Sequence, residues 1–261
     1  MSIHRSHVVS WNLTQRCNLE CEHCYISGGK ITKEEAAGEL STEECFKVID
    51  ELAEVNPEAL LILTGGEPLL RKDVFQIASY AHEKGFWVVV GTNGVFLTDE
   101  LCTRMIEAGV RGVSLSLDAL DAETHDRFRN VRGAWQNTVN GSQTLKRAGL
   151  PFIVQTTVGR HNHDDVQKIA SLAFDLGAKV FNLYFLVSTG RGTHVTDVTP
   201  DEYEGLMHEM VKLQRGFSGR MLVNAKCAPH YQRILFEEDP ESPFLKSFSE
   251  GAGGCPAGTH Y

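Results

Sequence analysis

The 261-residue chain is long enough for one large domain, or for one domain with a small appendage. Its net charge of −9, without a basic cluster, argues against a nucleic-acid partner, and no apolar run approaches the ~18 residues that a membrane helix requires. Seven cysteines, an odd number, argue against a closed disulfide framework and favour a reducing, cytoplasmic compartment.

Strand-like and helix-like segments alternate from residue 8 to about residue 215. The strand-like runs cover 8–13, 59–63, 86–90, 112–117, 152–157 and 180–186. The helix-like runs cover 41–55, 73–84, 98–108, 134–148, 164–176 and 200–215. Such β–α repeats predict an α/β fold with a parallel sheet and right-handed crossovers. Six repeats are too few to close an eight-stranded barrel.

The first strand-like run leads into a loop with three cysteines, Cys17, Cys21 and Cys24, at C-x-x-x-C-x-x-C spacing. Thiolates are the ligands that iron–sulfur clusters take, and a closed [4Fe–4S] site needs four of them. This loop supplies three, so the fourth iron would be open to a substrate or cofactor, as in open catalytic zinc sites. A zinc loop and a redox-active cysteine pair are the alternatives, but zinc sites mostly repeat C-x-x-C and no fourth ligand lies nearby.

Polar residues also follow the next strand-like run, where barrels of this kind gather their chemistry. The turn after residue 63 contains Gly65, Gly66, Glu67 and Pro68. Two glycines let the backbone approach a ligand closely, and Glu67 supplies a carboxylate. A strand-to-helix turn that is glycine-rich for its geometry alone is the alternative.

Further polar residues follow the third and fourth runs. Asn93 lies in a turn that could place its amide near a ligand. Ser116 and Asp118 share one face by the period of a strand and need partners if buried, either a ligand's ribose or the start of the next helix. Arg129 lies in a segment that we interpret as irregular, either paired with a ligand carboxylate or solvated at the surface.

These motifs together resemble those of the radical S-adenosylmethionine (SAM) enzymes. The cysteine spacing, the Gly-Gly-Glu-Pro turn at 65–68 and the Ser-Leu-Asp segment at 116–118 are the residues that carry the resemblance. It implies a partial (β/α)6 TIM-like barrel in which the open iron is chelated by SAM. It also implies that an electron from the cluster cleaves SAM to a 5′-deoxyadenosyl radical, which abstracts hydrogen from a substrate.

The resemblance implies a role for each motif. Cys17, Cys21 and Cys24 would hold the [4Fe–4S] cluster, and no catalytic side chain is predicted beyond the cluster and SAM. The predicted SAM contacts are His23, Gly65, Gly66, Glu67, Pro68, Asn93, Ser116, Asp118, Arg129 and Leu186. A reducing donor such as a ferredoxin or flavodoxin would supply the electron.

The β–α alternation stops near residue 217. We therefore divide the chain into a barrel core (1–195), a last barrel helix (196–216) and a C-terminal region (217–261), in which residues 221–234 predict a short strand, a loop and a helix. The glycine-rich segment around Cys255 resembles the opening of a SPASM or twitch extension, in which further cysteines bind auxiliary clusters. We expect an incomplete extension, with Cys255 a candidate ligand of a second iron–sulfur cluster.

Residues 226–233 and 253–258 resemble segments of the radical SAM proteins of alternative haem biosynthesis, which remodel side chains of sirohaem-derived tetrapyrroles. The leading hypothesis is a radical SAM enzyme that modifies a tetrapyrrole or a related cofactor precursor. A maturase of a ribosomal peptide is an alternative, but sixteen residues before Cys17 are too few for a leader-binding domain, so a separate protein would have to bind the leader. A non-catalytic iron–sulfur protein is a third hypothesis, which the Gly-Gly-Glu-Pro and Ser-Leu-Asp elements disfavour.

Overall fold

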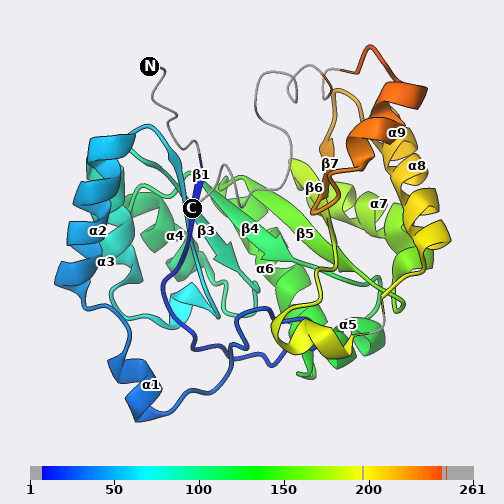
Figure 1. The fold of residues 1–261 in the computed structure, drawn as a ribbon. Helices are drawn as coiled ribbons and strands as arrows, with labels where there is room; N and C mark the ends of the chain where they lie inside the picture. Colours follow the sequence, from blue (N-terminus) through cyan, green and yellow to red (C-terminus); the bar gives the residue numbers. More distant parts are fainter. Residues whose placement is uncertain (1–7, 196, 243–244, 246–261) are drawn as a thin grey trace.

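Seven parallel strands form a single sheet in the order β1 to β7 in the computed structural model of the protein, which describes residues 8–195, 197–242 and 245 (Figure 1). The strands are β1 (Val8–Asn12), β2 (Leu60–Thr64), β3 (Trp87–Thr92), β4 (Gly112–Ser116), β5 (Phe152–Val158), β6 (Val180–Phe185) and β7 (Leu222–Lys226). The sheet is curled into a half-barrel with helices on its convex side. The predicted α/β half-barrel is confirmed.

The helices follow the strands in the predicted alternation. They are α1 (Lys33–Ala37), α2 (Thr42–Val55), α3 (Val74–Glu83), α4 (Asp99–Glu107), α5 (Ala122–Arg129), α6 (Ala134–Ala148), α7 (Val166–Leu176), α8 (Pro200–Gly216) and α9 (Tyr231–Glu238), with short 3-10 helices η1 (Pro68–Leu70), η2 (His163–Asp165) and η3 (Gly190–His194). All six strand-like and six helix-like runs are found close to their predicted bounds. The segment that ends at Arg129 is helical, not irregular as we expected, because Asp121 caps α5 by accepting from the Thr124 backbone N–H. No helix in the described part of the chain is long and apolar enough to cross a bilayer.

The seventh strand was not predicted as part of the barrel sheet. Residues Leu222–Lys226 pair in parallel with β6, with Asn182 opposite Asn224 and Tyr184 opposite Lys226. Val223 is 1% exposed and belongs to the same core as the other strands. The half-barrel therefore includes part of the C-terminal region (217–261), which we had separated from the barrel on sequence grounds. Cys255 lies outside the described residues.

The two faces of the sheet differ in chemistry. On the convex face, side chains such as Leu61, Val88 and Phe181 are fully buried beneath the helices. Successive strand residues point to opposite faces, so the residues between these core positions face the concave side. Toward the β7 edge this concave row is polar, and it includes Ser116, Gln155, Asn182, Tyr184, Asn224 and Lys226. The concave face of the sheet is therefore polar toward the β7 edge.

Candidate functional site

The cysteine loop follows β1 and closes on itself. The backbone N–H of Cys17 donates to the Gly29 carbonyl at 2.8 Å, and the Gly29 N–H donates to the Gln15 carbonyl at 3.1 Å. These bonds join the two ends of the loop, so Cys21 and Cys24 lie in a closed turn. The loop sits at the carboxyl edge of the sheet, where parallel half-barrels place their chemistry.

The structure brings the three predicted cysteines together. Cys17, Cys21 and Cys24 belong to one small cluster built around Leu19 and Ala134. Each sulfur faces a nitrogen donor: the Leu19 N–H at 3.4 Å from Cys17, the Gly28 N–H at 3.3 Å from Cys24, and Arg129 Nη1 at 3.6 Å from Cys21. Donors of this kind stabilise thiolate charge and tune iron–sulfur clusters. The donor set therefore fits a cluster held by three thiolates.

The protonation of these thiols depends on what binds them. Burial raises the pKa of Cys17 to about 11, and it also raises the pKa of Cys21. A metal must therefore displace the protons when it binds, which couples binding to proton release. Within the described residues, no three His, Cys, Asp or Glu side chains are placed to hold one metal ion. Thiolates on separate corners of a cubic cluster need no such convergence on one ion, so this finding is compatible with the predicted cluster.

The two glycines of the Gly-Gly-Glu-Pro turn pack against the cysteine loop. The Gly66 N–H donates to the Thr14 carbonyl and the Glu67 N–H to the Arg16 carbonyl, both at 2.7 Å. A Cβ at Gly65 would lie 2.4 Å from the Thr14 oxygen, and a Cβ at Gly66 would lie 2.3 Å from the Arg16 oxygen. The two glycines are thus required because another segment of the backbone, at Thr14 and Arg16, lies directly against them. Their predicted contact with SAM stays a prediction.

We expect Gly66→Ala to lower the free energy of unfolding by about 2–3 kcal/mol, since an added methyl group would overlap backbone that cannot move aside. Urea unfolding, followed by circular dichroism, measures this loss. Gly205→Ala in α8 is the matched control, because nothing lies within 4 Å of its Cβ position. That control should be neutral or stabilising by up to about 1 kcal/mol. Equal stability of the two variants would show that the Gly66 contact is not close in solution.

Glu67 is fully buried, and its carboxylate is bound within the protein. It accepts from the Thr92 hydroxyl at 2.8 Å, the Asn93 N–H at 2.9 Å and the Leu69 N–H at 3.1 Å. Burial raises the pKa of Glu67 to about 7, against the lowering effect of these bonds. Asn93 Nδ2 in turn donates to Asn18 Oδ1 at 2.8 Å and lies 3.8 Å from the Cys17 sulfur. Glu67 and Asn93 therefore tie the ends of β2 and β3 to the cysteine loop.

Asp118 and Arg129 form a buried ion pair. Arg129 Nε donates to Asp118 Oδ2 at 2.6 Å, and the Thr157 N–H donates to Oδ1 at 2.8 Å. Asp118 is 0% exposed and Arg129 is 6% exposed, which excludes the surface alternative for the arginine. Although burial opposes ionisation, the guanidinium lowers the pKa of Asp118 to about 2. The two residues that we expected to bind ribose and carboxylate groups form this pair, and Arg129 also reaches the Cys21 sulfur. Their contacts with SAM stay predictions.

The remaining predicted SAM contacts lie around this centre. The His23 ring stacks on Phe128 with centroids 4.4 Å apart. Ser116 lies at the end of β4 and is half-buried, Pro68 is buried at the start of η1, and Leu186 follows β6. Burial lowers the pKa of His23 to about 3, so its imidazole is neutral at physiological pH. Their contacts with SAM stay predictions.

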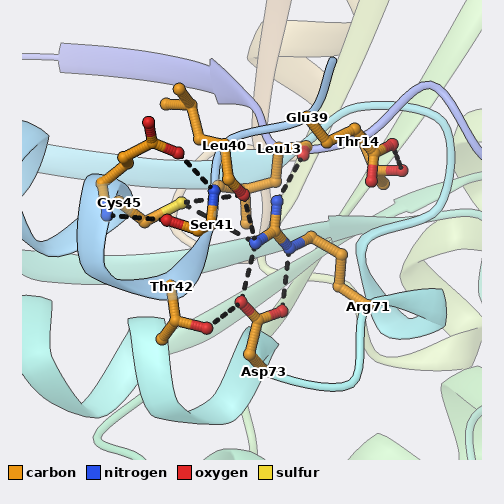
Figure 2. A network of polar contacts seen from close by, with 10 residues as sticks. Leu13, Thr14, Glu39, Leu40, Ser41, Thr42, Cys45, Arg71 and Asp73 are labelled. Carbon is orange, nitrogen blue, oxygen red and sulfur yellow. Dashed lines mark hydrogen bonds and ion pairs between the residues drawn. The ribbon is translucent and has the colours of Figure 1, made fainter. Parts of the chain in front are cut away.

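Arg71 fixes the start of the cysteine loop, a role that the sequence did not reveal (Figure 2). Its guanidinium donates to the Leu13 carbonyl and to the Leu40 carbonyl, both at 3.0 Å. Asp73 orients it through two bonds of 2.9 and 2.7 Å and accepts a further bond from Thr42 at 2.8 Å. Paired bonds of this geometry hold a guanidinium rigidly. The network therefore joins β1, the segment before α2 and the segment after η1.

Arg191 holds the far side of the same loop. Its Nε donates to the Cys21 carbonyl and its Nη2 to the Gly28 carbonyl, both at 2.8 Å, while its backbone N–H donates to the Cys24 carbonyl at 3.0 Å. The sequence indicated no role for Arg191. The structure shows that it clamps the cysteine loop.

We expect Arg191→Ala to accelerate chelator-driven loss of iron about tenfold or more, because two hydrogen bonds of about 1 kcal/mol each would be lost. Iron release to an excess of a strong chelator, followed by absorbance under anaerobic conditions, measures the rate. Arg147→Ala is the control, since Arg147 pairs with Asp99 at the surface of α4 and α6. The same rate in both variants would contradict the clamp.

Comparisons with known proteins agree with this geometry. The profile of the radical SAM superfamily matches residues 11–173. An AdoMet-dependent heme synthase of Methanosarcina barkeri is 42% identical over 259 residues, which cover 97% of this chain and 72% of that protein. An Fe-coproporphyrin III synthase of the same organism is 35% identical, over 90% of this chain and 60% of that one. The structure of Streptococcus suis SuiB bound to S-adenosylmethionine is similar in fold, with a TM-score of 0.73 at 11% identity, over 96% of this chain and 56% of that one.

Proposed function

The chain belongs to the radical SAM superfamily, and from this premise we propose that it modifies a tetrapyrrole or a related cofactor precursor. It is a radical SAM enzyme, with a [4Fe–4S] cluster and SAM as its cofactors. The observation that carries the substrate class is the similarity to the AdoMet-dependent heme synthase, which spans 97% of this chain. The polar side chains of the concave face support the proposal, since they offer hydrogen-bonding partners to a polar substrate.

The residues of this chain have distinct parts in the proposed reaction. Cys17, Cys21 and Cys24 would hold three irons of the cluster. When bound, the cluster and SAM supply an electron and a 5′-deoxyadenosyl radical that abstracts hydrogen from the substrate. The chain then contributes chiefly orientation, because a hydrogen abstraction needs no acid–base pair. The Asp118–Arg129 pair keeps the cationic group beside Cys21 in one position.

We further propose that the enzyme works in the reducing cytoplasm and accepts its electron from a ferredoxin or flavodoxin. A cluster with an open iron is sensitive to oxygen, and its reduction requires a low-potential donor. We also retain the proposal that Cys255 marks the start of a SPASM-like extension with a second cluster. Counting iron per chain in the wild type and in a Cys255→Ala variant tests that part.

The test of the substrate class is an anaerobic assay with reconstituted protein, SAM and dithionite. Iron coproporphyrin III, sirohaem derivatives and candidate precursor peptides are supplied in parallel, and products are measured by mass spectrometry. A mass change in a tetrapyrrole, with stoichiometric 5′-deoxyadenosine, is the expected result. Modification of a peptide alone would establish the maturase alternative. A fully loaded protein that forms no 5′-deoxyadenosine would instead support a non-catalytic role.

A further inference from the structure

The concave face of the half-barrel carries a single charge on its strands. Following the strand register, the concave row includes Ser114 and Ser116 on β4, Gln155 on β5, Asn182 and Tyr184 on β6, and Asn224 and Lys226 on β7. Among the strand residues of this face that the structure describes, Lys226 is the charged one. A cation among neutral polar groups is a selective partner for an anion, because no fixed carboxylate on this face competes for it.

The position of Lys226 follows from its neighbours. Val223 and Ala225 pack with the convex core, so Asn224 and Lys226 face the concave side. Asn224 Nδ2 donates to Asn182 Oδ1 at 3.0 Å across the two strands, which confirms this orientation for β7. The residue opposite Lys226 is Tyr184.

Tyr184 lies between Lys226 and Gln155 on the concave face. Its hydroxyl accepts from Gln155 Nε2 at 3.2 Å. Burial raises the pKa of Tyr184 to about 12, with smaller contributions from Cys227 and from Tyr25. Tyr25 directly follows the last cysteine, is 59% exposed, and donates from its hydroxyl to Asn12 Oδ1 at 2.9 Å. The segment that follows β6 reaches the same loop, because the Arg191 backbone N–H donates to the Cys24 carbonyl at 3.0 Å and a Cβ at Gly190 would lie 2.5 Å from the Tyr25 carbonyl oxygen.

The environment of Lys226 suits a ligand. Its side chain is exposed, and among the described residues no carboxylate lies within ion-pair distance of it. Desolvation by the surrounding protein lowers the pKa of Lys226. A charge that has already lost part of its water gains more from a bound anion than a fully solvated lysine does.

We propose that Lys226 binds a carboxylate side chain of the substrate and so orients the substrate over the cysteine loop. The inference rests on the proposed function, since acetate and propionate groups are the anionic handles of a tetrapyrrole. The exposed ring of Tyr25 offers a flat apolar surface on the same side. Lys226 is thus a substrate-binding residue that determines specificity for acidic substrates.

Binding of iron coproporphyrin III, which has four propionates, tests this inference directly. Titrations of the reconstituted protein are followed anaerobically by the porphyrin absorbance band, with the tetramethyl ester as the uncharged ligand. Lys226→Ala should weaken binding of the acid about 10- to 100-fold, the effect expected when a charge-assisted hydrogen bond is lost, and should leave ester binding within about twofold. Lys226→Arg, which keeps the charge, should bind the acid within about fivefold of the wild type.

Lys179→Ala is the matched control, because Lys179 is an exposed lysine just before β6, at the opposite end of the sheet. It should bind both ligands as the wild type does. Equal binding of the acid by the wild type and Lys226→Ala would overturn the role of Lys226 while leaving the tetrapyrrole proposal intact. A wild-type protein that binds neither porphyrin would overturn both.

Discussion

Replacing Cys21 by alanine should abolish formation of 5′-deoxyadenosine, with a loss of at least about a thousandfold in rate. Cys21 is 8% exposed, lies between Cys17 and Cys24 in the closed loop, and its sulfur faces Arg129 Nη1 at 3.6 Å. Without it two thiolates remain, and the loop cannot hold three irons of a cubic cluster. The effect on rate is therefore close to complete, because every turnover needs the electron that the cluster delivers. Product formation by chromatography and the SAM-perturbed resonance of the reduced cluster are the two measurements.

The control for Cys21 is Cys102→Ala. Cys102 is fully buried on α4 and contributes only packing, so its replacement should leave iron content unchanged. Urea unfolding of the metal-free proteins shows whether either variant has lost its fold. SAM cleavage at the wild-type rate by Cys21→Ala would show that the ligand assignment is wrong.

Asp118→Asn should destabilise the metal-free chain by about 3–5 kcal/mol, the second large effect that we expect. Asp118 is 0% exposed and supplies the carboxylate for Arg129, so its neutralisation leaves a buried guanidinium without a counter-charge. Arg129→Met should be comparably harmful, since it leaves the carboxylate alone. The double variant should recover most of the loss, because it contains neither unpaired charge. Urea unfolding of all four proteins measures the coupling, and additive losses would contradict the ion pair.

The dependence on pH gives an independent check of this pair. The pKa of Asp118 is lowered to about 2 in the folded protein, below its value of about 3.9 in an unfolded chain. The pair therefore contributes its full stability above about pH 4, and the contribution is lost as pH falls toward 2. The difference in unfolding free energy between the wild type and Asp118→Asn should accordingly shrink between pH 5 and pH 2.

The sequence predicted the scaffold well because its signals are local. Alternation of apolar runs fixes each strand and helix, and caps such as Ser41 with Glu44 mark where helices begin. The cysteine spacing was likewise a local pattern, and the structure brings the three cysteines together in one cluster. The short strand at β7 was predicted, but its place in the barrel sheet was missed because long-range pairing with β6, which no local pattern reveals, decides it.

The contacts that side chains make with residues far away in the sequence could not be predicted. The sequence offers no rule that joins Asp118 to Arg129 in preference to a ligand, since both are equally suited to bind one. Arg71 and Arg191 donate to backbone carbonyls, and every residue of the cysteine loop carries such an acceptor. Glycine at position 66 indicated close approach correctly, but the approaching group is backbone of Arg16. The type of a side chain thus indicated which chemical groups it can bind, but not which group of the protein or of a ligand it does bind.

The clamp from Arg191 has a consequence for how the enzyme matures. Its bond to the Cys21 carbonyl spans 170 positions of the chain. Loop closure over such a separation is entropically demanding and comes late in folding, after neighbouring segments have joined. During synthesis, the cysteines leave the ribosome long before the arginine that will hold them. Assembly factors that deliver iron and sulfide would therefore meet the cysteine loop before Arg191 has bound it. The contacts from Arg191 would then fix the loop after the cluster is in place.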